Sequence, residues 1–484
     1  MKKWNIRVVS TFPGRECGIG VYAKNKLTGT GKWQGETGSI NVTAIDDGGN
    51  HEYDSLVDMK IDQYSTESWV RSAGDISTRA IEKSSGGTIP TMVDLHLEYG
   101  IGGADWQKDD NYNPFLDALR ETPAYKQGLL AIIGTKHTVL ADPSEFHRKV
   151  DEGIVSKCDA TVVLSGLGKN IMDLYGVGEE IGRIEHINHG ARMYDYSLED
   201  RLDLKRSWGF NEDVFTFVTP GLISPNKGIY SCGVPGYALA AKEIAKDFPK
   251  LQTRMIIRGK CHPDFEYIRT DGKKPVIRPA FAEFSQAADK ILDDSGLKLN
   301  MGNAFVDREL LDVIGKRTKD AMHGIAMEYR FLTNGEYSRT LAGGDVQSLL
   351  NQQKQQVTSG QLIESESHGC DTVAGKFWHA VEVLSNINQG DNLEDTLDLT
   401  KMPREGEIIG IDDPEARGLL VDIGKGRDTI AQVARAMYNC VADREHHEMR
   451  RANAKEYGKP LKFDKIHLEY LELAEDILKK RKVA

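Results

Sequence analysis

The 484-residue sequence contains no run of about 18 apolar residues, the length that a membrane-spanning helix needs. Its six cysteines show no C-x-x-C spacing, which argues against a disulfide scaffold or a zinc site and fits a reducing compartment. Basic residues are fewer than acidic ones, 62 against 73, so the surface as a whole is not expected to bind nucleic acid. The basic start passes directly into a strand pattern rather than a signal peptide. We therefore expect a cytoplasmic protein.

Several common ligand-binding motifs are also missing. No D-x-D occurs, which removes the usual carboxylate pair for holding Mg²⁺ or Mn²⁺ on a diphosphate. The segment SGLGK at 165–169 lacks the earlier glycine of a P-loop, because Val163 stands in its place. The G-x-G at 18–20 lacks the third glycine of a dinucleotide fingerprint. The NAD interpretation is therefore weak, although a two-domain oxidoreductase remains an alternative.

Short apolar runs with strand character alternate with longer helical patterns along most of the chain. Near-continuous apolar strands separated by helices are typical of parallel sheets covered on both faces. At about 150 residues per domain, the length favours two or three domains. We predict an α/β protein with strands at 5–10, 40–45, 129–134, 160–164, 214–218 and 254–259.

A charged stretch at 193–212 interrupts this pattern, and we interpret it as the linker between two α/β domains. The first domain is then expected at 1–195 and the second at 212–455. The remaining segment, 456–484, has apolar residues at helical spacing, which predicts a last helix over roughly 464–482.

Polar loop segments follow several predicted strands at their carboxyl ends, where ligands bind in open α/β sheets. The first of them contains Gly18, Ile19 and Gly20. Glycines there let the backbone approach a ligand, and the amides of a helix start favour an anion. A plain tight turn explains the same residues equally well.

Two histidines in the first half end predicted strands. His137 follows a buried strand, where it could exchange a hydrogen bond with a substrate hydroxyl near neutral pH, or simply serve as a satisfied structural histidine. His189 and Gly190 end the last strand of the first half, just before the expected linker. We therefore expect them to face a cleft between the domains.

In the second half, Lys227 stands at a helix entrance after a strand, which suits a point charge against a phosphate. Alone, such a lysine is more often an exposed surface residue. Farther on, Glu364 lies in the early turns of a predicted helix, where it either reaches a ligand at the helix tip or complements the helix dipole. Ser359 is a good N-cap for that helix and leaves three amides as expected donors to an anion: Gly360, Gln361 and Leu362.

Together these segments resemble glycosyltransferase family 4, the retaining, nucleotide-sugar-dependent enzymes of the GT-B fold. The subgroup it resembles most carries an H-E-Y-G-type segment, in which Leu97 here occupies the histidine place and His96 lies one residue earlier. The similarity runs collinearly along nearly the whole chain. It is carried by STFPGRECGIGVYAKN at 10–25, LEYGIGG at 97–103, GTKHTVLADPS at 134–144, INHGAR at 187–192, TPGLISPNKG at 219–228, SGQLIESESHG at 359–369, KFWHAVEVL at 376–384 and RGLLVDIGKG at 417–426.

The resemblance implies two Rossmann-like domains facing a cleft, with the donor mainly on the second domain, the acceptor mainly on the first, and the last helix crossing back to the first domain. It implies transfer of a hexose, with mannose or glucose favoured, without a metal or other cofactor. The implied partners are a nucleotide sugar donor and a glycan, lipid-linked or small-molecule acceptor. Peripheral membrane contact, as in relatives that glycosylate lipids, is compatible with the sequence.

By the same resemblance, Lys227 binds the donor's diphosphate and Glu364 binds the ribose hydroxyls. The amides of 360–362 bind the distal phosphate. Phe331 and its neighbours fall where the family holds the base through main-chain contacts.

In the first domain, the resemblance implies that Gly18 and Gly20 close over the same phosphates and that His137 contacts the transferred sugar. Two positions depart from the family. The first glutamate of its E-x₇-E pair is here Gln356, an amide that cannot offset developing positive charge, and its common arginine is here Leu222. A catalytically impaired sugar-nucleotide or glycan-binding relative is therefore the alternative to an active transferase.

Overall fold

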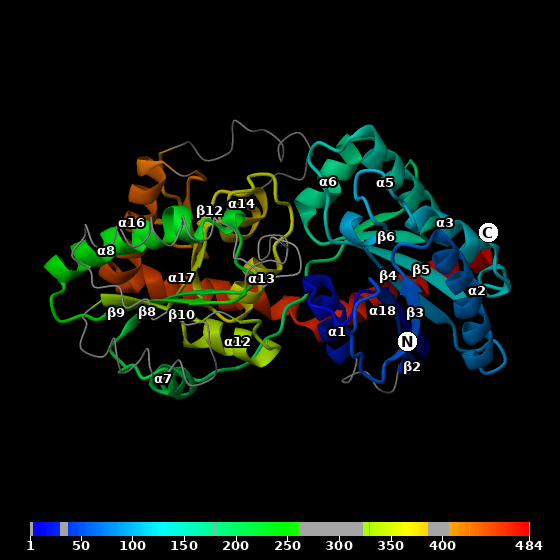
Figure 1. Ribbon diagram of the computed structural model, residues 1–484, viewed down its shortest axis with the longest axis horizontal. Coiled ribbons are helices and arrows are strands. Elements are labelled where there is room, and N and C mark those ends of the chain that lie inside the picture. The colour runs from blue at the N-terminus through cyan, green and yellow to red at the C-terminus, as the bar shows by residue number, and fades with distance from the viewer. Residues whose placement is uncertain are drawn as a thin grey trace, which may run out of the picture. The chain divides into compact units, whose positions relative to one another are not determined.

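The computed structural model describes residues 3–29, 37–178, 180–260, 323–328, 330–385, 406–424 and 426–483. The chain divides into two compact units. The first consists of Met1–Ala191 and Pro460–Ala484, and the second of Arg192–Lys459. Each unit is built on one parallel sheet with helices on both faces (Figure 1). Within the described ranges, no helix has the length and apolar character that crossing a membrane requires.

The first unit contains a seven-stranded sheet in the order β3-β2-β1-β4-β5-β6-β7. Every residue of β1, β4 and β5 is buried, as expected for central strands of a sheet covered on both faces. The carboxyl ends of these strands lie at one edge, where β4 and β5 present polar side chains. The strands are β1 Trp4–Ser10, β2 Thr37–Asp46, β3 Val57–Asp62, β4 Thr91–Leu97, β5 Leu130–Lys136, β6 Ala160–Val163 and β7 Ile184–His186.

Two apolar clusters cover the two faces of this sheet. One joins α1 and α18 to the sheet and contains the buried side chains of Tyr22, Ile466 and Tyr470, and the other joins α2, α3 and α5. The last helix of the chain is thus part of the first unit. The helices are α1 Gly18–Gly29, α2 Thr66–Lys83, η2 Tyr99–Ile101, α3 Tyr112–Glu121, α4 Pro123–Lys126, α5 Glu145–Lys157, α6 Gly166–Leu174 and α18 Phe463–Val483, the last preceded by η5 Lys459–Leu461.

The second unit contains a six-stranded parallel sheet in the order β10-β9-β8-β11-β12-β13. Its strands are β8 Phe215–Pro220, β9 Thr253–Arg258, β10 His323–Glu328, β11 Val346–Leu349, β12 Asp371–Gly375 and β13 Gly418–Val421. Its helices are α7 Leu198–Ser207, η3 Pro225–Lys227, η4 Ile229–Gly233, α8 Val234–Asp247, α12 Asn334–Gly343, α13 Gly360–Ser367, α14 Trp378–Leu384, α16 Arg427–Ala442 and α17 Arg444–Gly458. The two parallel sheets confirm the predicted α/β class with two Rossmann-like domains.

The expected linker at 193–212 is wrong in part, because it contains helix α7 of the second unit. Ser197 caps this helix in a capping box with Asp200. Charged side chains then attach it to the sheet: Lys205 Nζ, although buried, donates to Asp345 Oδ2 at 2.7 Å. Arg201 Nε donates to the Ala342 carbonyl at 2.8 Å. A helix docked by ion pairs lacks the apolar periodicity that would reveal it in sequence.

Candidate functional site

Lys227 lies beyond the carboxyl end of β8, in the short helix η3. Its Nζ donates to the side-chain oxygen of Gln361 at 2.9 Å. No carboxylate in the described ranges pairs with it, and burial lowers the pKa of Lys227 to about 8. The turn that follows needs a glycine, because Gly228 has φ +64° and a Cβ there would lie 2.2 Å from the Leu350 carbonyl oxygen. The backbone thus fixes a partly buried ammonium that, within the described part of the chain, donates to an amide oxygen and pairs with no carboxylate.

Gln361 links Lys227 to the start of helix α13. Its Nε2 donates to the Pro220 carbonyl at the end of β8 at 2.8 Å, while its Oε1 accepts from Lys227. Ser359 caps the helix as predicted, since its side chain accepts from the amide of Leu362 at 3.4 Å. The Leu362 amide is therefore not a free donor, in contrast to the expectation. The amides of Gly360 and Gln361 belong to the first turn, which has no intrahelical acceptors.

The ammonium of Lys227 therefore lies beside a helix N-terminus, which itself carries partial positive charge. The ammonium and the partial positive charge of the helix N-terminus repel one another, and burial of the lysine makes its charged form still less favourable. An anion bound between the ammonium and the helix N-terminus would offset both the repulsion and the cost of burying the charge. It would also accept hydrogen bonds from the ammonium and from the helix amides. The geometry is that of an anion site.

Glu364 lies one turn farther along α13 and is buried. Its Oε1 accepts from Arg192 Nε at 3.0 Å, and its buried Oε2 has no hydrogen-bond partner in the described ranges. Burial raises the pKa of Glu364, although Arg192 opposes that rise. Among the described residues, Arg192 Nη1 is also buried without a hydrogen-bond partner, and the guanidinium carbon lies 5.4 Å from the Tyr337 ring centre. A ligand with several hydroxyls would satisfy these groups.

Two other predicted residues of the second unit have different surroundings. Gln356 uses both ends of its amide within its own loop: Nε2 donates to the Thr358 carbonyl at 2.8 Å, and Oε1 accepts from Asn351. Phe331 is 37% exposed and lies two residues before Thr333, the cap of α12. Its neighbour Tyr329 lies outside the described residues.

In the first unit, the glycine segment begins helix α1. Gly20 has a packing reason to be glycine, because a Cβ there would lie 3.1 Å from the backbone of Phe12. A Cβ at Gly18 would meet nothing within 4 Å, so packing does not require glycine there. Ile19 packs partly buried against the core cluster of α2, α3 and α5.

His137 and His189 lie around the ring of Tyr22, one turn into the same helix. Tyr22 contacts the His137 ring at 5.0 Å and the His189 ring at 4.6 Å between centroids. Burial, with further repulsion from His96 and His189, lowers the pKa of His137 well below its usual value. Burial alone lowers the pKa of His189 to about 4. Both imidazoles are therefore neutral at physiological pH.

Gly190 continues this packing, since a Cβ there would lie 2.5 Å from the Phe463 ring of α18. The structure thus brings His137 and His189 together in the first unit. In the second unit it brings together Lys227, Ser359, Gly360, Gln361, Leu362 and Glu364. Arg192, Tyr22 and His96 contact these groups but were not among the predicted residues. Arg192 lies inside the INHGAR segment, so the family resemblance contained the signal for it.

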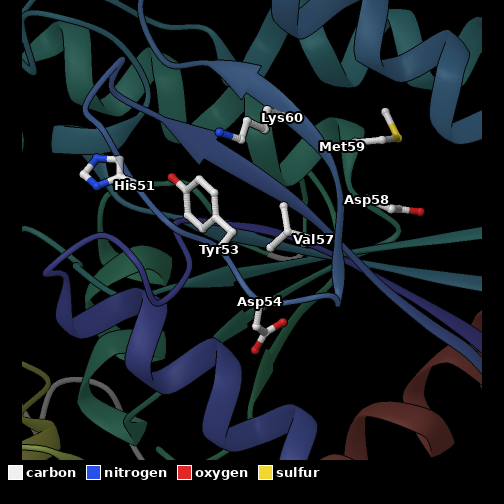
Figure 2. Close-up of a pocket in the computed structure, with 7 residues that line it drawn as sticks. All are labelled: His51, Tyr53, Asp54, Val57, Asp58, Met59 and Lys60. Carbon is white, nitrogen blue, oxygen red and sulfur yellow. The ribbon is translucent and has the colours of Figure 1, made fainter.

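A pocket of about 390 Å³ lies elsewhere on the first unit, at the edge strand β3 (Figure 2). The nearby Asp46 and Asp47 already pair with Lys60 at 3.0 Å and Arg15 at 3.2 Å, and His51 lies 2.6 Å from Asp47. The charged side chains around this pocket are thus compensated, and the pocket contains none of the predicted site residues. It is lined by His51, Tyr53, Asp54, Val57, Asp58, Met59 and Lys60.

Neither a protein-family model nor a curated protein sequence matches this chain. Solved structures, however, are similar over nearly its full length. A glycosyltransferase from Rickettsia africae is 14% identical, with 99% of this chain and 100% of that chain covered, at a TM-score of 0.59. HepE from Anabaena, solved with UDP and glucose, is 12% identical, with 97% and 99% covered, at a TM-score of 0.56. Sucrose-phosphate synthase from Thermosynechococcus elongatus is 13% identical, with 99% and 100% covered, at a TM-score of 0.57. These similarities show the GT-B fold.

Proposed function

We propose that this chain transfers a hexosyl group, glucose or mannose, from a nucleoside diphosphate sugar to a hydroxyl acceptor. The observation that carries the proposal is the Lys227 ammonium held beside the N-terminus of α13, with no carboxylate partner among the residues that the structure describes. A diphosphate is the anion that fits, because it spans more than one donor group and remains doubly charged or more at neutral pH. The solved structures of the same fold include glycosyltransferases, and HepE binds UDP and UDP-glucose.

Glu364 is the proposed partner of the ribose. Its Oε2, which has no hydrogen-bond partner among the described residues, accepts from a ribose hydroxyl, while Arg192 donates to the other oxygen. The base lies against the main chain near Phe331, and that segment therefore determines which nucleotide base the donor carries. On the first unit, the amides of Gly18–Gly20 approach the phosphates, and His137 contacts the transferred sugar.

The proposed reaction breaks the bond between the anomeric carbon and the phosphate oxygen, and it forms a bond from that carbon to the acceptor oxygen on the same face. The acceptor hydroxyl loses its proton to the departing phosphate oxygen. Negative charge develops on the leaving diphosphate, where Lys227 and the amides of α13 stabilise it. Configuration is thus retained, and the positive charge comes from the protein without a metal ion. The acceptor is a glycan, a lipid-linked sugar or a small molecule.

The test is the variant Lys227→Ala, with Lys242→Ala on the exposed face of α8 as the matched control. UDP-glucose and GDP-mannose serve as donors, with binding measured by calorimetry and turnover by nucleotide release on an acceptor panel. We expect Lys227→Ala to lower kcat by about 10²–10³, the usual effect of removing one donor from a transition-state anion. Unchanged turnover in Lys227→Ala would contradict the proposal. Donor binding without any turnover in the unaltered protein would instead favour an impaired relative, in which Gln356 replaces a required carboxylate.

A further inference from the structure

A buried ion pair lies behind the candidate sugar-facing histidine of the first unit. Lys26 Nζ on α1 donates to Asp94 Oδ2 on β4 at 2.8 Å, and both side chains are at most 2% exposed. Thr135 donates to the other carboxylate oxygen at 2.9 Å. Burial by itself would raise the pKa of Asp94, but Lys26 and His96 outweigh it and hold that pKa well below its usual value. Asp94 is therefore a carboxylate at neutral pH.

This carboxylate determines which nitrogen of His96 carries the proton. Nε2 of His96 lies 3.4 Å from Asp94 Oδ2, on a side chain that is fully buried. A nitrogen lone pair pointing at a buried carboxylate would be repelled, whereas an N–H is attracted even where the alignment is poor for a hydrogen bond. Nε2 of His96 therefore carries the proton, and in the neutral ring Nδ1 is left as an acceptor.

The acceptor nitrogen Nδ1 of His96 determines which nitrogen of His137 carries the proton. Nδ1 of His96 lies 2.9 Å from Nε2 of His137, and the two ring planes are 23° apart with centroids 5.1 Å from one another, so the rings meet edge to edge. Since His96 accepts at this contact, His137 Nε2 donates. A neutral His137 then has its lone pair on Nδ1, for which the described part of the chain supplies no hydrogen-bond partner. Tyr22 packs edge-on against both rings and holds this orientation.

We propose that His96 is a positioning residue that fixes His137 as a hydrogen-bond acceptor at Nδ1, so that His137 selects a hydroxyl of the transferred sugar. This inference rests on the proposed function, in which His137 contacts that sugar. A fixed acceptor matches an O–H donor and rejects a carboxylate, a phosphate or a carbonyl oxygen. The inferred role of His137 is thus recognition of a neutral hydroxyl, whereas the ammonium of Lys227 suits an anion.

Such a histidine is not a general base. Its neutral form persists well below neutral pH because of burial and the neighbouring histidines, so it has little tendency to take a proton from a hydroxyl. Its contribution is recognition, which appears in the choice of donor sugar.

The first experiment needs no ligand. Nitrogen-15 NMR of the histidine rings in the full chain, with His137 assigned by comparison with His137→Phe, reports which nitrogen carries the proton. We expect the proton on Nε2 of His137 and slow exchange of that proton with water. His96→Gln keeps an acceptor oxygen and should preserve this state, whereas His96→Phe should make exchange faster. A proton on Nδ1 of His137 in the unaltered protein would overturn the inference, whether or not His96→Phe folds.

The second experiment uses UDP-glucose, or whichever donor turns over, and its monodeoxy sugars. One deoxy position should lower kcat/KM by about tenfold in the unaltered protein, because a buried acceptor is left unpaired. The same position should have no effect in His137→Phe and a reduced effect in His96→Phe. The exposed His186→Phe is the control and should behave as the unaltered protein. If removal of each sugar hydroxyl changed kcat/KM by the same factor in His137→Phe as in the unaltered protein, the inference would be refuted. A failure of every donor would refute the proposed function instead, while the NMR result still decides the state of His137.

Discussion

Lys26 in the first unit and Lys227 in the second are both deprived of water, and burial lowers the pKa of each to about 8. Their partners differ. Lys26 lies 2.8 Å from the carboxylate of Asp94 and 2.9 Å from the ring centre of Tyr470, so its charge is compensated within the protein. Lys227 has an amide oxygen at 2.9 Å and a helix N-terminus nearby. A buried charge with an internal counter-ion holds the fold together, whereas one without it marks a place for an external anion.

The largest expected difference between the two lysines is in stability. Lys26→Met leaves the Asp94 carboxylate buried and unpaired, which should lower the free energy of unfolding by about 3–5 kcal/mol. Urea denaturation measures this loss. Lys24→Met, on the same helix, breaks an exposed pair with Asp54 and should cost at most about 1 kcal/mol. Equal losses in the two variants would remove the distinction between the buried and the exposed pair.

The double variant Lys26→Met with Asp94→Leu sharpens the same comparison. Removal of both charges leaves no unpaired ion, so much of the stability lost in Lys26→Met should return. The measurement is again urea denaturation, read as a double-mutant cycle. A double variant no more stable than Lys26→Met would show that the lysine stabilises by packing against Tyr470 rather than by its charge.

The next effect is the pH dependence of anion binding. The Lys227 ammonium is present below a pKa of about 8 in the free protein and is lost above it, so the affinity for UDP should fall as the pH rises through about 8. A hydrogen bond to a charged group contributes about 1.5–3 kcal/mol, so loss of the ammonium should weaken binding roughly tenfold or more. Calorimetry across this range measures it. Lys227→Arg keeps its charge and should show no such fall, and a parallel fall in both proteins would assign it to another group.

The smallest effect is on the stability of the ligand-free second unit. Because the folded protein holds Lys227 at a pKa of about 8, below that of an exposed lysine, the charged form opposes folding below pH 8, and this cost disappears as the pH rises toward the unfolded pKa. The lowered pKa corresponds to a cost of up to about 3 kcal/mol at pH 7, and the bond to Gln361 offsets about 1.5–3 kcal/mol of it. Lys227→Met should therefore raise stability at pH 7 by about 1 kcal/mol or less. Thermal unfolding at pH 7 and above pH 10 tests the sign. A destabilising Lys227→Met at pH 7 would mean that its bond to Gln361 outweighs the burial cost.

Local signals in the sequence predicted part of this molecule. The central strands β1, β5, β8 and β9 are apolar runs, and the periodicity places each within a few residues of its observed bounds. Ser359 was predicted as the cap of α13 from its own side chain and the residues after it. Such features depend only on neighbours in the chain.

The remaining features depend on partners far away in the sequence. The prediction from continuous apolar runs misses β4, because Asp94 and His96 interrupt its apolar run. Their partners Lys26 and His137 lie 68 and 41 residues away, and the sequence does not reveal such pairs. Helix α7 was likewise assigned to a linker because its sequence is charged. The contact that holds Lys205, with Asp345, lies 140 residues away in the sequence. The polar core and the charged helix therefore emerge only in the folded chain.

The position of helix α18 has a consequence for biosynthesis. Residues of this helix, among them Tyr470, complete the core of the first unit, and Tyr470 bonds Thr135 at 3.0 Å. The ribosome must therefore translate all of the second unit before the first can close its core. In most two-domain chains the leading domain folds while the trailing one is still being made. Here the leading domain waits until α18 has been made, so deletion of α18 should leave it with an open apolar face.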